Sequence, residues 1–248
     1  MRILILGGTT EASLLAQAVS HVGFDAVFSY AGRTEAPLPQ PLPTRIGGFG
    51  GVAGLIDYLI ANEITHVVDA THPFAAQISA NAVKACAALQ TPMITLQRAA
   101  WIATPADRWT NVADTAAAVA ALPDAPTSVF LAIGKQTLAD FAAKPQHHYL
   151  LRLVDPPQEP LILPHTTVIL ARGPFDVAGD TALLRSHQIS HIVAKNAGGK
   201  GASAKLAVAR ALNLGVIMID RPALPPRKVV QNVAAVMDWL HHCADLGV

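Results

Sequence analysis

The sequence predicts an α/β protein built from two similar domains, each with a mainly parallel sheet flanked by helices. The chain begins with an apolar run at residues 3–6 that stops at Gly7 and Gly8 and leads directly into a helical pattern, as in a strand–turn–helix unit. The motif at residues 64–68 recurs at residues 189–193, and a polar loop and an Ala-rich helix follow each copy. With 248 residues the chain is long enough for two domains.

Composition restricts the classes of function. Hydrophobic residues make up 52% of the chain and charged residues 14%, against about 25% charged in a typical domain, which favours Ala-rich helices over buried sheets. The net charge is +1 and the basic residues are scattered, which argues against nucleic acid or an anionic membrane as a partner. No apolar run approaches the roughly 18 residues of a membrane span or the h-region of a signal peptide. We therefore expect a cytoplasmic protein.

Cysteine and histidine spacing gives no sign of a metal site. Cys86 and Cys243 lie in Ala-rich helical patterns without a CxxC motif, so we expect buried, reduced thiols. No HExxH motif or comparable cluster occurs either. We predict that the protein binds no metal.

The turn after the first strand resembles the dinucleotide fingerprint G-x-G-x-x-G/A. Gly7 takes the turn position and Ala12 the close-packing position, but Thr9 replaces the second glycine. The helix that follows directs unpaired N–H groups and the positive end of its dipole at this turn, which favours a phosphate. We predict a Rossmann-like domain whose phosphate site consists of Gly7, Gly8, Thr9, Thr10 and Glu11. An ordinary βα turn is the alternative.

The end of the second predicted strand, residues 26–30, indicates which dinucleotide binds. In the dinucleotide fold this strand end faces the adenosine ribose, where an acidic residue suits NAD and a basic residue suits NADP. Ser29, Ala31, Gly32 and Arg33 stand there, with no acidic residue before Glu35. We therefore predict NADP as the cofactor, although a solvated arginine in a loop would give the same pattern.

Two further segments complete the predicted cofactor site. Gly48, Phe49 and Gly50 belong to a loop that lets the backbone approach a flat ligand while the ring packs on it, or that is simply flexible. Asp69, Thr71 and His72 follow a buried strand, at the sheet edge where α/β proteins bind ligands. Asp69 and His72 are candidates for the proton donor, while a helix cap or a packing role is the alternative for His72.

The second half of the chain carries a different set of polar residues at its predicted strand ends. The loop of the second copy is cationic and rich in glycine, and a glycine turn at residue 134 precedes another lysine. Such a rim suits a ligand with several carboxylates or phosphates, with solvated surface residues as the alternative. The predicted substrate-binding residues are Lys135, Arg172, Lys195, Asn196, Gly198, Gly199 and Ser203. The Pro-rich stretch at residues 123–126 is the expected domain boundary.

Read together and in order, six strings resemble the precorrin-6A reductase family of cobalamin biosynthesis. The resemblance spans nearly the whole chain. The strings are ILGGTTEA at residues 5–12, SYAGR at 29–33, GGFGG at 47–51, DATHPFA at 69–75, KNAGG at 195–199 and IMIDRP at 217–222. Singly, only DATHPFA would be persuasive.

The resemblance implies NADPH-dependent reduction of one macrocycle double bond, converting precorrin-6A into precorrin-6B. It fits a first domain, 1–123, that binds NADP and a second domain, 124–248, that binds the tetrapyrrole carboxylates, with the active site in the cleft between them. Neighbouring enzymes of the pathway are possible partners. The alternatives are a cobalt-precorrin-6A reductase and a non-catalytic NADP sensor. A short-chain dehydrogenase is disfavoured because neither Tyr58 nor Tyr149 has a lysine four residues later.

Overall fold

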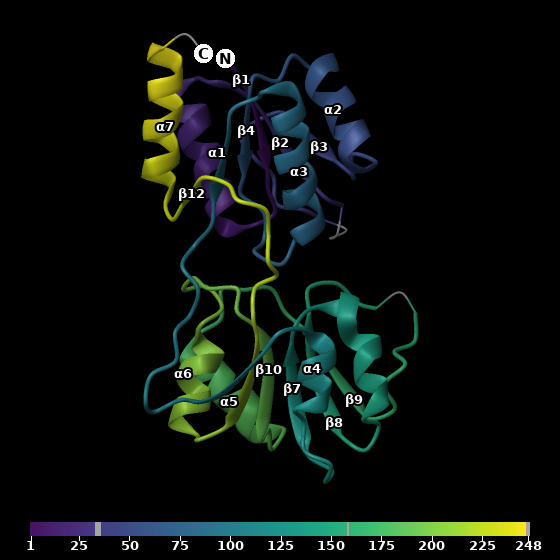
Figure 1. The fold of residues 1–248 in the computed structure, drawn as a ribbon. Coiled ribbons are helices and arrows are strands. Elements are labelled where there is room, and N and C mark those ends of the chain that lie inside the picture. The colour runs from purple at the N-terminus through teal and green to yellow at the C-terminus, as the bar shows by residue number, and fades with distance from the viewer. Residues whose placement is uncertain (33–35, 158, 247–248) are drawn as a thin grey trace. The chain divides into compact units, whose positions relative to one another are not determined.

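The computed structural model describes residues 1–32, 36–157 and 159–246. The chain forms two compact units, one comprising Met1–Ala99 with Ala223–Val248 and the other Ala100–Pro222 (Figure 1). Each unit has one six-stranded sheet with helices packed on it, and every strand pair is parallel. The predicted fold class is confirmed. Among the described helices, none has the length and apolar character needed to cross a membrane.

The first unit has the strand order β12-β5-β4-β1-β2-β3. The middle of its sheet is buried, because β1 and β4 lie there and almost all their side chains are buried, whereas the edge strands β3 and β12 are partly exposed. The strands are β1 (Arg2–Leu6), β2 (Asp25–Tyr30), β3 (Thr44–Ile46), β4 (His66–Asp69), β5 (Met93–Leu96) and β12 (Val229–Val230). The helices are α1 (Thr10–Val22), α2 (Gly51–Ala61), α3 (Ala76–Leu89) and α7 (Val233–Asp245).

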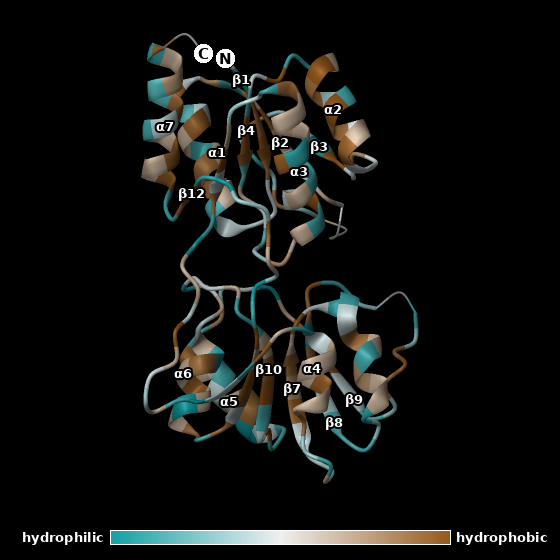
Figure 2. Ribbon diagram, viewed as in Figure 1, coloured by the Kyte–Doolittle hydropathy of each residue, from teal (hydrophilic) through white to brown (hydrophobic). Residues whose placement is uncertain are grey.

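Alternation along β1 divides the core of the first unit into two layers. Ile3 and Ile5 pack with α1 and α7, whereas Leu4 and Leu6 pack with α2 and α3. Figure 2 shows the apolar strands between these helix pairs, whose outer faces carry more polar residues. Both faces of the sheet are thus covered, so the carboxyl edge of its strands is left to bind a ligand.

The second unit repeats this arrangement with the strand order β6-β11-β10-β7-β8-β9. Helices α5 and α6 share a core with β10 and β11, while α4 contacts β6 and β11. The strands are β6 (Arg108–Val112), β7 (Ser128–Ala132), β8 (His148–Leu153), β9 (Thr166–Leu170), β10 (His191–Lys195) and β11 (Gly215–Ile219). The helices are α4 (Thr115–Ala120), the 3-10 helix η1 (Lys135–Ala143), α5 (Val177–Ser186) and α6 (Ala204–Ala211).

The division of the chain differs from the boundary expected after residue 123. Residues 100–122 belong to the second unit, where β6 pairs with β11, and residues 223–248 return to the first unit, where β12 pairs with β5. Each sheet is therefore completed at one edge by a strand that is remote in sequence from the strand it joins. Because the first unit contains two separate segments of the chain, a single boundary in the sequence cannot divide the two units.

Two local features bear on the predicted site residues. Residues 135–143, after the glycine turn at Gly134, form a 3-10 helix with non-helical backbone at Thr137. Helix α3 begins at Ala76 with Ala75 as its N-cap, and no side chain caps it. His72 therefore does not cap this helix, which was the alternative role expected for it.

Candidate active site

Gly7 and Gly8 form the turn predicted to bind phosphate, at the carboxyl end of β1. The Gly7 N–H donates to the Ser29 carbonyl at 2.9 Å, and a Cβ on Gly7 would lie 2.1 Å from Phe28 Cζ, so a larger residue does not fit without movement. Gly8 has φ +111°, and a Cβ there would have no neighbour within 4 Å. The turn thus exposes bare backbone where the helix dipole favours an anion.

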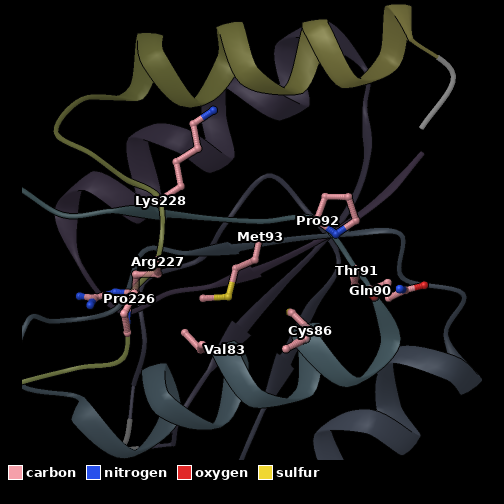
Figure 3. A pocket seen from close by; sticks show the side chains of 10 residues that line it. Val83, Cys86, Gln90, Thr91, Pro92, Met93, Pro226, Arg227 and Lys228 are labelled. Carbon is pink, nitrogen blue, oxygen red and sulfur yellow. The ribbon is translucent and has the colours of Figure 1, made fainter.

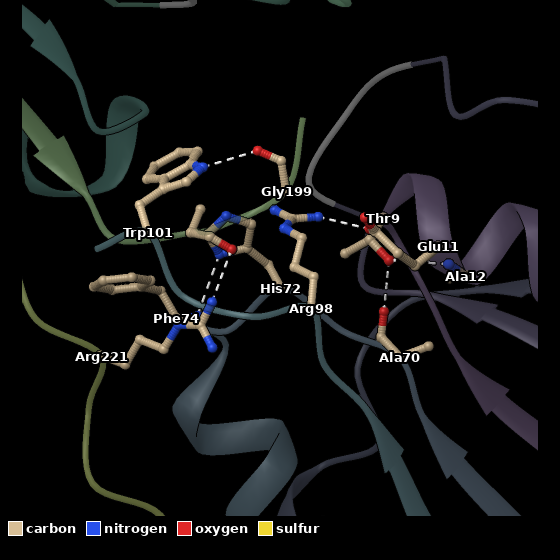
Figure 4. A network of polar contacts seen from close by, with 11 residues as sticks. Thr9, Glu11, Ala12, Ala70, His72, Phe74, Arg98, Trp101, Gly199 and Arg221 are labelled. Carbon is tan, nitrogen blue, oxygen red and sulfur yellow. Dashed lines mark hydrogen bonds and ion pairs between the residues drawn. The ribbon is translucent and has the colours of Figure 1, made fainter. Parts of the chain in front are cut away.

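Thr9 and Glu11 hold the start of α1 in place, where Thr10 is the first helical residue. Thr9 Oγ1 accepts a hydrogen bond from Ala12 N–H at 3.1 Å and donates one to the Ala70 carbonyl at 2.8 Å (Figure 4). The Glu11 carboxylate pairs with Arg98, which follows β5, at 2.6 Å (Figure 4). This ion pair offsets a negative charge that would otherwise repel a phosphate at the turn.

Arg45 is a candidate functional residue that the sequence analysis missed. It lies in β3, beside the carboxyl end of β2, and its Nη1 donates to Ser29 Oγ at 2.8 Å. Further hydrogen bonds to the Gly47 and Gly48 carbonyls, at 2.9 and 3.0 Å, fix the guanidinium. Burial lowers the pKa of Arg45, yet a guanidinium keeps its proton at neutral pH. A fixed cation therefore stands at the end of β2, the place where dinucleotide-binding folds hold the adenosine ribose.

The signal that could have revealed Arg45 is its parallel pairing, since Ser29 and Arg45 are register partners. A three-residue edge strand has no apolar run to reveal that pairing. Arg33, the cation predicted for this position, lies outside the described residues. Ala31 and Gly32 follow β2, and Gly32 has φ +75°.

The loop at residues 48–50 contributes an aromatic support. The centroid of the Phe49 ring lies 3.8 Å from the Arg45 guanidinium carbon, and the ring makes an edge contact with Tyr58. Gly50, with φ +78°, is the N-cap of α2. Phe49 thus packs on the Arg45 guanidinium, and its direct contact with a ligand stays a prediction.

Asp69, Thr71 and His72 lie at the carboxyl end of β4. Asp69 is 1% exposed, and its Oδ1 accepts hydrogen bonds from the Thr71 N–H and hydroxyl at 3.1 and 2.6 Å. The other oxygen, Oδ2, is buried and has no hydrogen-bond partner among the described residues. His72 Nδ1 accepts from Phe74 N–H at 3.2 Å, which assigns the proton of the neutral ring to Nε2.

In the second unit, the predicted residues Lys195, Asn196, Gly198 and Gly199 follow β10. Burial lowers the pKa of Lys195, as expected for an ammonium group partly removed from water. Gly198 and Gly199 both have positive φ. The loop therefore combines a partly desolvated cation with two glycines, of which Gly198 is buried and Gly199 partly buried. A cation of this kind suits a carboxylate.

Two hydrogen bonds between Asn196 and Trp101 fix this loop. Asn196 is 7% exposed, and its amide accepts from the Trp101 N–H at 2.8 Å and donates to the Trp101 carbonyl at 3.0 Å. The Trp101 indole N–H donates to the Gly199 carbonyl at 2.8 Å (Figure 4), and Arg221 donates to the Asn196 and Ala197 carbonyls. The observed contacts make Asn196 a support of the loop, and a direct substrate contact stays a prediction.

The remaining predicted substrate residues are spread over the unit. Lys135, the first residue of η1, and Arg172, which follows β9, are exposed. Ser203 precedes α6, and its hydroxyl donates to the Lys200 carbonyl at 2.9 Å. Lys135 and Arg172 follow the carboxyl ends of β7 and β9, and Ser203 lies between the end of β10 and the start of α6.

The first unit has a cavity of about 320 Å³ (Figure 3). Its walls come from α3, from the start of β5 and from the segment before β12, so it opens at the amino ends of these strands. Burial raises the pKa of Cys86 in its wall to about 12, which keeps this thiol protonated. The cavity contains none of the predicted site residues.

Comparison with known proteins gives a consistent result. The sequence model of the family described as precorrin-6x reductase CbiJ/CobK matches residues 2–241. The precorrin-6A reductase of Rhodobacter capsulatus is 65% identical, over 100% of this chain and 99% of the relative. The cobalt-precorrin-6A reductase of Priestia megaterium is 30% identical, over 90% of this chain and 91% of the relative.

A solved structure described as CobK precorrin-6A reductase superimposes with a TM-score of 0.94 at 64% identity, covering 98% of this chain and 96% of that chain. Both the sequence and the fold of this chain therefore match one group of reductases over nearly their whole length.

Proposed function

Because the chain belongs to the precorrin-6x reductase family, an oxidoreductase family of cobalamin biosynthesis, we propose that it reduces precorrin-6A to precorrin-6B with NADPH. We propose NADPH and not NADH because the Arg45 guanidinium is fixed beside Ser29. When bound, NADPH supplies the hydride, so the protein has to bind, orient and protonate.

The residues of the first unit fit such a cofactor. Gly7 and Gly8 present backbone at the start of α1 for the pyrophosphate, and the Glu11–Arg98 pair keeps this position free of net negative charge. We assign the ribose phosphate to Ser29 and Arg45, which share a hydrogen bond, and Arg33 is a second candidate there. A guanidinium stacked on Phe49 keeps little rotamer freedom, so binding orders it at low entropic cost.

The second unit is proposed to bind the tetrapyrrole. Precorrins carry several carboxylates, and Lys135, Arg172 and Lys195 are cations of the kind that bind them. Asn196 and Ser203 shape the loop around Lys195, and a backbone contact from Gly198 or Gly199 to the ligand stays a prediction. The location of the active site between the two domains and the pathway enzymes as partners stay predictions.

For the proton, the structure offers Asp69 and His72. The Asp69 Oδ2 atom is buried without a hydrogen-bond partner in the described part of the chain, and the His72 Nε2 carries a proton in the neutral ring. Asp69→Asn and His72→Gln are the informative variants. If both variants keep wild-type turnover, neither side chain donates the proton, and water or a substrate carboxyl does.

Turnover with each candidate substrate tests the proposal. Purified protein is expected to consume NADPH in the presence of metal-free precorrin-6A. This consumption is measured as the loss of the absorbance of the reduced nicotinamide. Identity of 65% to a precorrin-6A reductase, against 30% to a cobalt-precorrin-6A reductase, favours the metal-free substrate. Turnover of only the cobalt-bearing macrocycle, or only with NADH, would contradict the proposal.

A further inference from the structure

The two units correspond residue by residue along their outer strands and the helices that follow. Val230 pairs with Leu96 in one sheet, and Val112 pairs with Ile219 in the other. Two residues after each strand, Asn232 and Asp114 cap α7 and α4 in the same way, accepting from the backbone N–H three residues on at 2.9 and 2.8 Å. Helix α7 is therefore the counterpart of α4.

Burial supports this alignment of the two helices. Val236 and Ala118 occupy the same place after their caps, and both are 0% exposed. Leu240 and Leu122 follow four residues later and are 0% and 3% exposed. In the same register, Ala121 is the counterpart of Trp239.

In the first unit, Trp239 covers a histidine. Its ring packs edge-on against His66, with 5.6 Å between ring centroids, and His66 is 0% exposed. The His66 Nδ1 lies 2.9 Å from the Thr65 hydroxyl, which fixes the ring. The second unit repeats the histidine, since His191 begins β10 and its Nδ1 lies 2.9 Å from the Ser190 hydroxyl.

The second unit lacks the covering indole. Ala121 stands in place of Trp239, and α4 ends at Ala120, so a cavity of about 400 Å³ is left beside His191. This volume lies within the roughly 300–1,000 Å³ of small-molecule sites. Gly215 in its wall cannot be larger without displacing His191, because a Cβ there would lie 2.9 Å from His191 Cδ2.

Charge indicates the kind of ligand. Arg108 lines the cavity, and its Nη1 donates to the Asn213 carbonyl at 3.0 Å, which leaves most of its donors to other partners. Among the described residues no acidic side chain lines this cavity, and none forms an ion pair with Arg108. The cavity thus combines a histidine face, an apolar wall from Ile217 and one available cation.

We propose that this cavity binds a small planar aromatic carboxylate. Its ring takes the place against His191 that the Trp239 indole takes against His66, and its carboxylate binds Arg108. The site lies at the amino ends of β6, β10 and β11. It is therefore separated from the Lys195 end of β10 by four residue steps, about 13 Å.

Indole-3-acetate is the probe, with neutral indole for comparison, and binding to the full chain is measured by ligand-observed NMR and calorimetry. We expect saturable binding of indole-3-acetate to wild type at millimolar concentrations or below. Ala121→Trp, which supplies the missing indole, should weaken it by at least about tenfold. Ala120→Trp is the matched control, because Ala120 is exposed and does not line the cavity, and it should bind as wild type does.

Arg108→Gln tests the contribution of the Arg108 charge to binding separately from that of the cavity's shape. Arg108 is exposed, so this variant should fold normally, lose affinity for indole-3-acetate and keep its affinity for indole. Wild type that fails to bind the probe at millimolar concentration overturns the proposal, as does binding that neither Ala121→Trp nor Arg108→Gln changes by more than about twofold. The Arg108→Gln comparison decides the question even if Ala121→Trp does not fold.

Discussion

Arg45→Gln provides the sharpest test of the proposed cofactor site. Three of the five guanidinium N–H groups bind Ser29, Gly47 and Gly48, which leaves two donors for a ligand among the described contacts. A hydrogen bond to a charged group contributes about 1.5–3 kcal/mol. Loss of one such bond to the ribose phosphate should therefore raise the Kd for NADPH by about tenfold to a hundredfold.

The assay compares Kd values for NADPH and NADH, measured by fluorescence or calorimetry. NADH lacks the phosphate, so its Kd should change by less than about twofold in Arg45→Gln. Arg45→Lys keeps the charge without the planar contact to Phe49 and should fall between wild type and Arg45→Gln. Arg108→Gln in the second unit is the matched control and should leave both nucleotides unaffected.

The reasoning would be refuted if Arg45→Gln weakened NADH as much as NADPH. Arg45 would then only support its loop, through the bonds to the Gly47 and Gly48 carbonyls. Arg33→Ala, tested beside it, shows which arginine selects the phosphate. If Arg33→Ala alone abolishes the preference for NADPH, the selecting cation is Arg33.

Three further predictions concern stability. Arg152 and Asp180 form an ion pair with side chains 9% and 4% exposed, so Asp180→Ala should lower the free energy of unfolding by about 3–5 kcal/mol. Urea titration measures this, the double variant Arg152→Met/Asp180→Leu should restore most of it, and a cost under about 1 kcal/mol would contradict the argument. Gly7→Ala should cost about 1–3 kcal/mol, because the new Cβ would lie 2.1 Å from Phe28 Cζ, and Phe28→Leu in the same chain should recover part of that cost. Burial lowers the pKa of His66 in the folded protein. As the pH falls, the histidine of the unfolded chain, with a pKa of about 6.5, therefore gains its proton at a higher pH than the folded one. Stability should thus fall as the pH drops from about 7 towards 5. A Tm series should show a smaller fall for His66→Gln, and an unchanged slope would exclude His66 as the cause.

The parts of the fold with strong local patterns could be predicted from the sequence. The apolar run of β1, the glycine turn and α1 are consecutive, so local periodicity and turn chemistry reveal them together. Strands β3 and β12 are short and lie at sheet edges, where burial imposes little pattern. They form because a neighbouring strand offers unpaired backbone groups, which is a property of the sheet.

The same distinction applies to the candidate site. The turn at Gly7 and Gly8 follows from adjacent residues, whereas the Glu11–Arg98 pair joins positions far apart in the sequence. Asn196 has the chemistry of a ligand-binding residue, but its amide is engaged by the backbone of Trp101. The same side chain can bind a ligand or stabilise the fold, and its contacts with residues distant in the sequence determine which of the two it does.

By itself, the sequence determined two parallel α/β units, a glycine turn after the first strand and a cationic second half, because these features depend on local periodicity, composition and repetition. Tertiary structure alone decided that residues 223–248 complete the first sheet, that Arg45 stands beside Ser29, and that Ala121 leaves a cavity where Trp239 fills its counterpart. These depend on contacts between distant segments, and such contacts are fixed only when the whole sheet assembles and each buried polar or apolar group finds its partner.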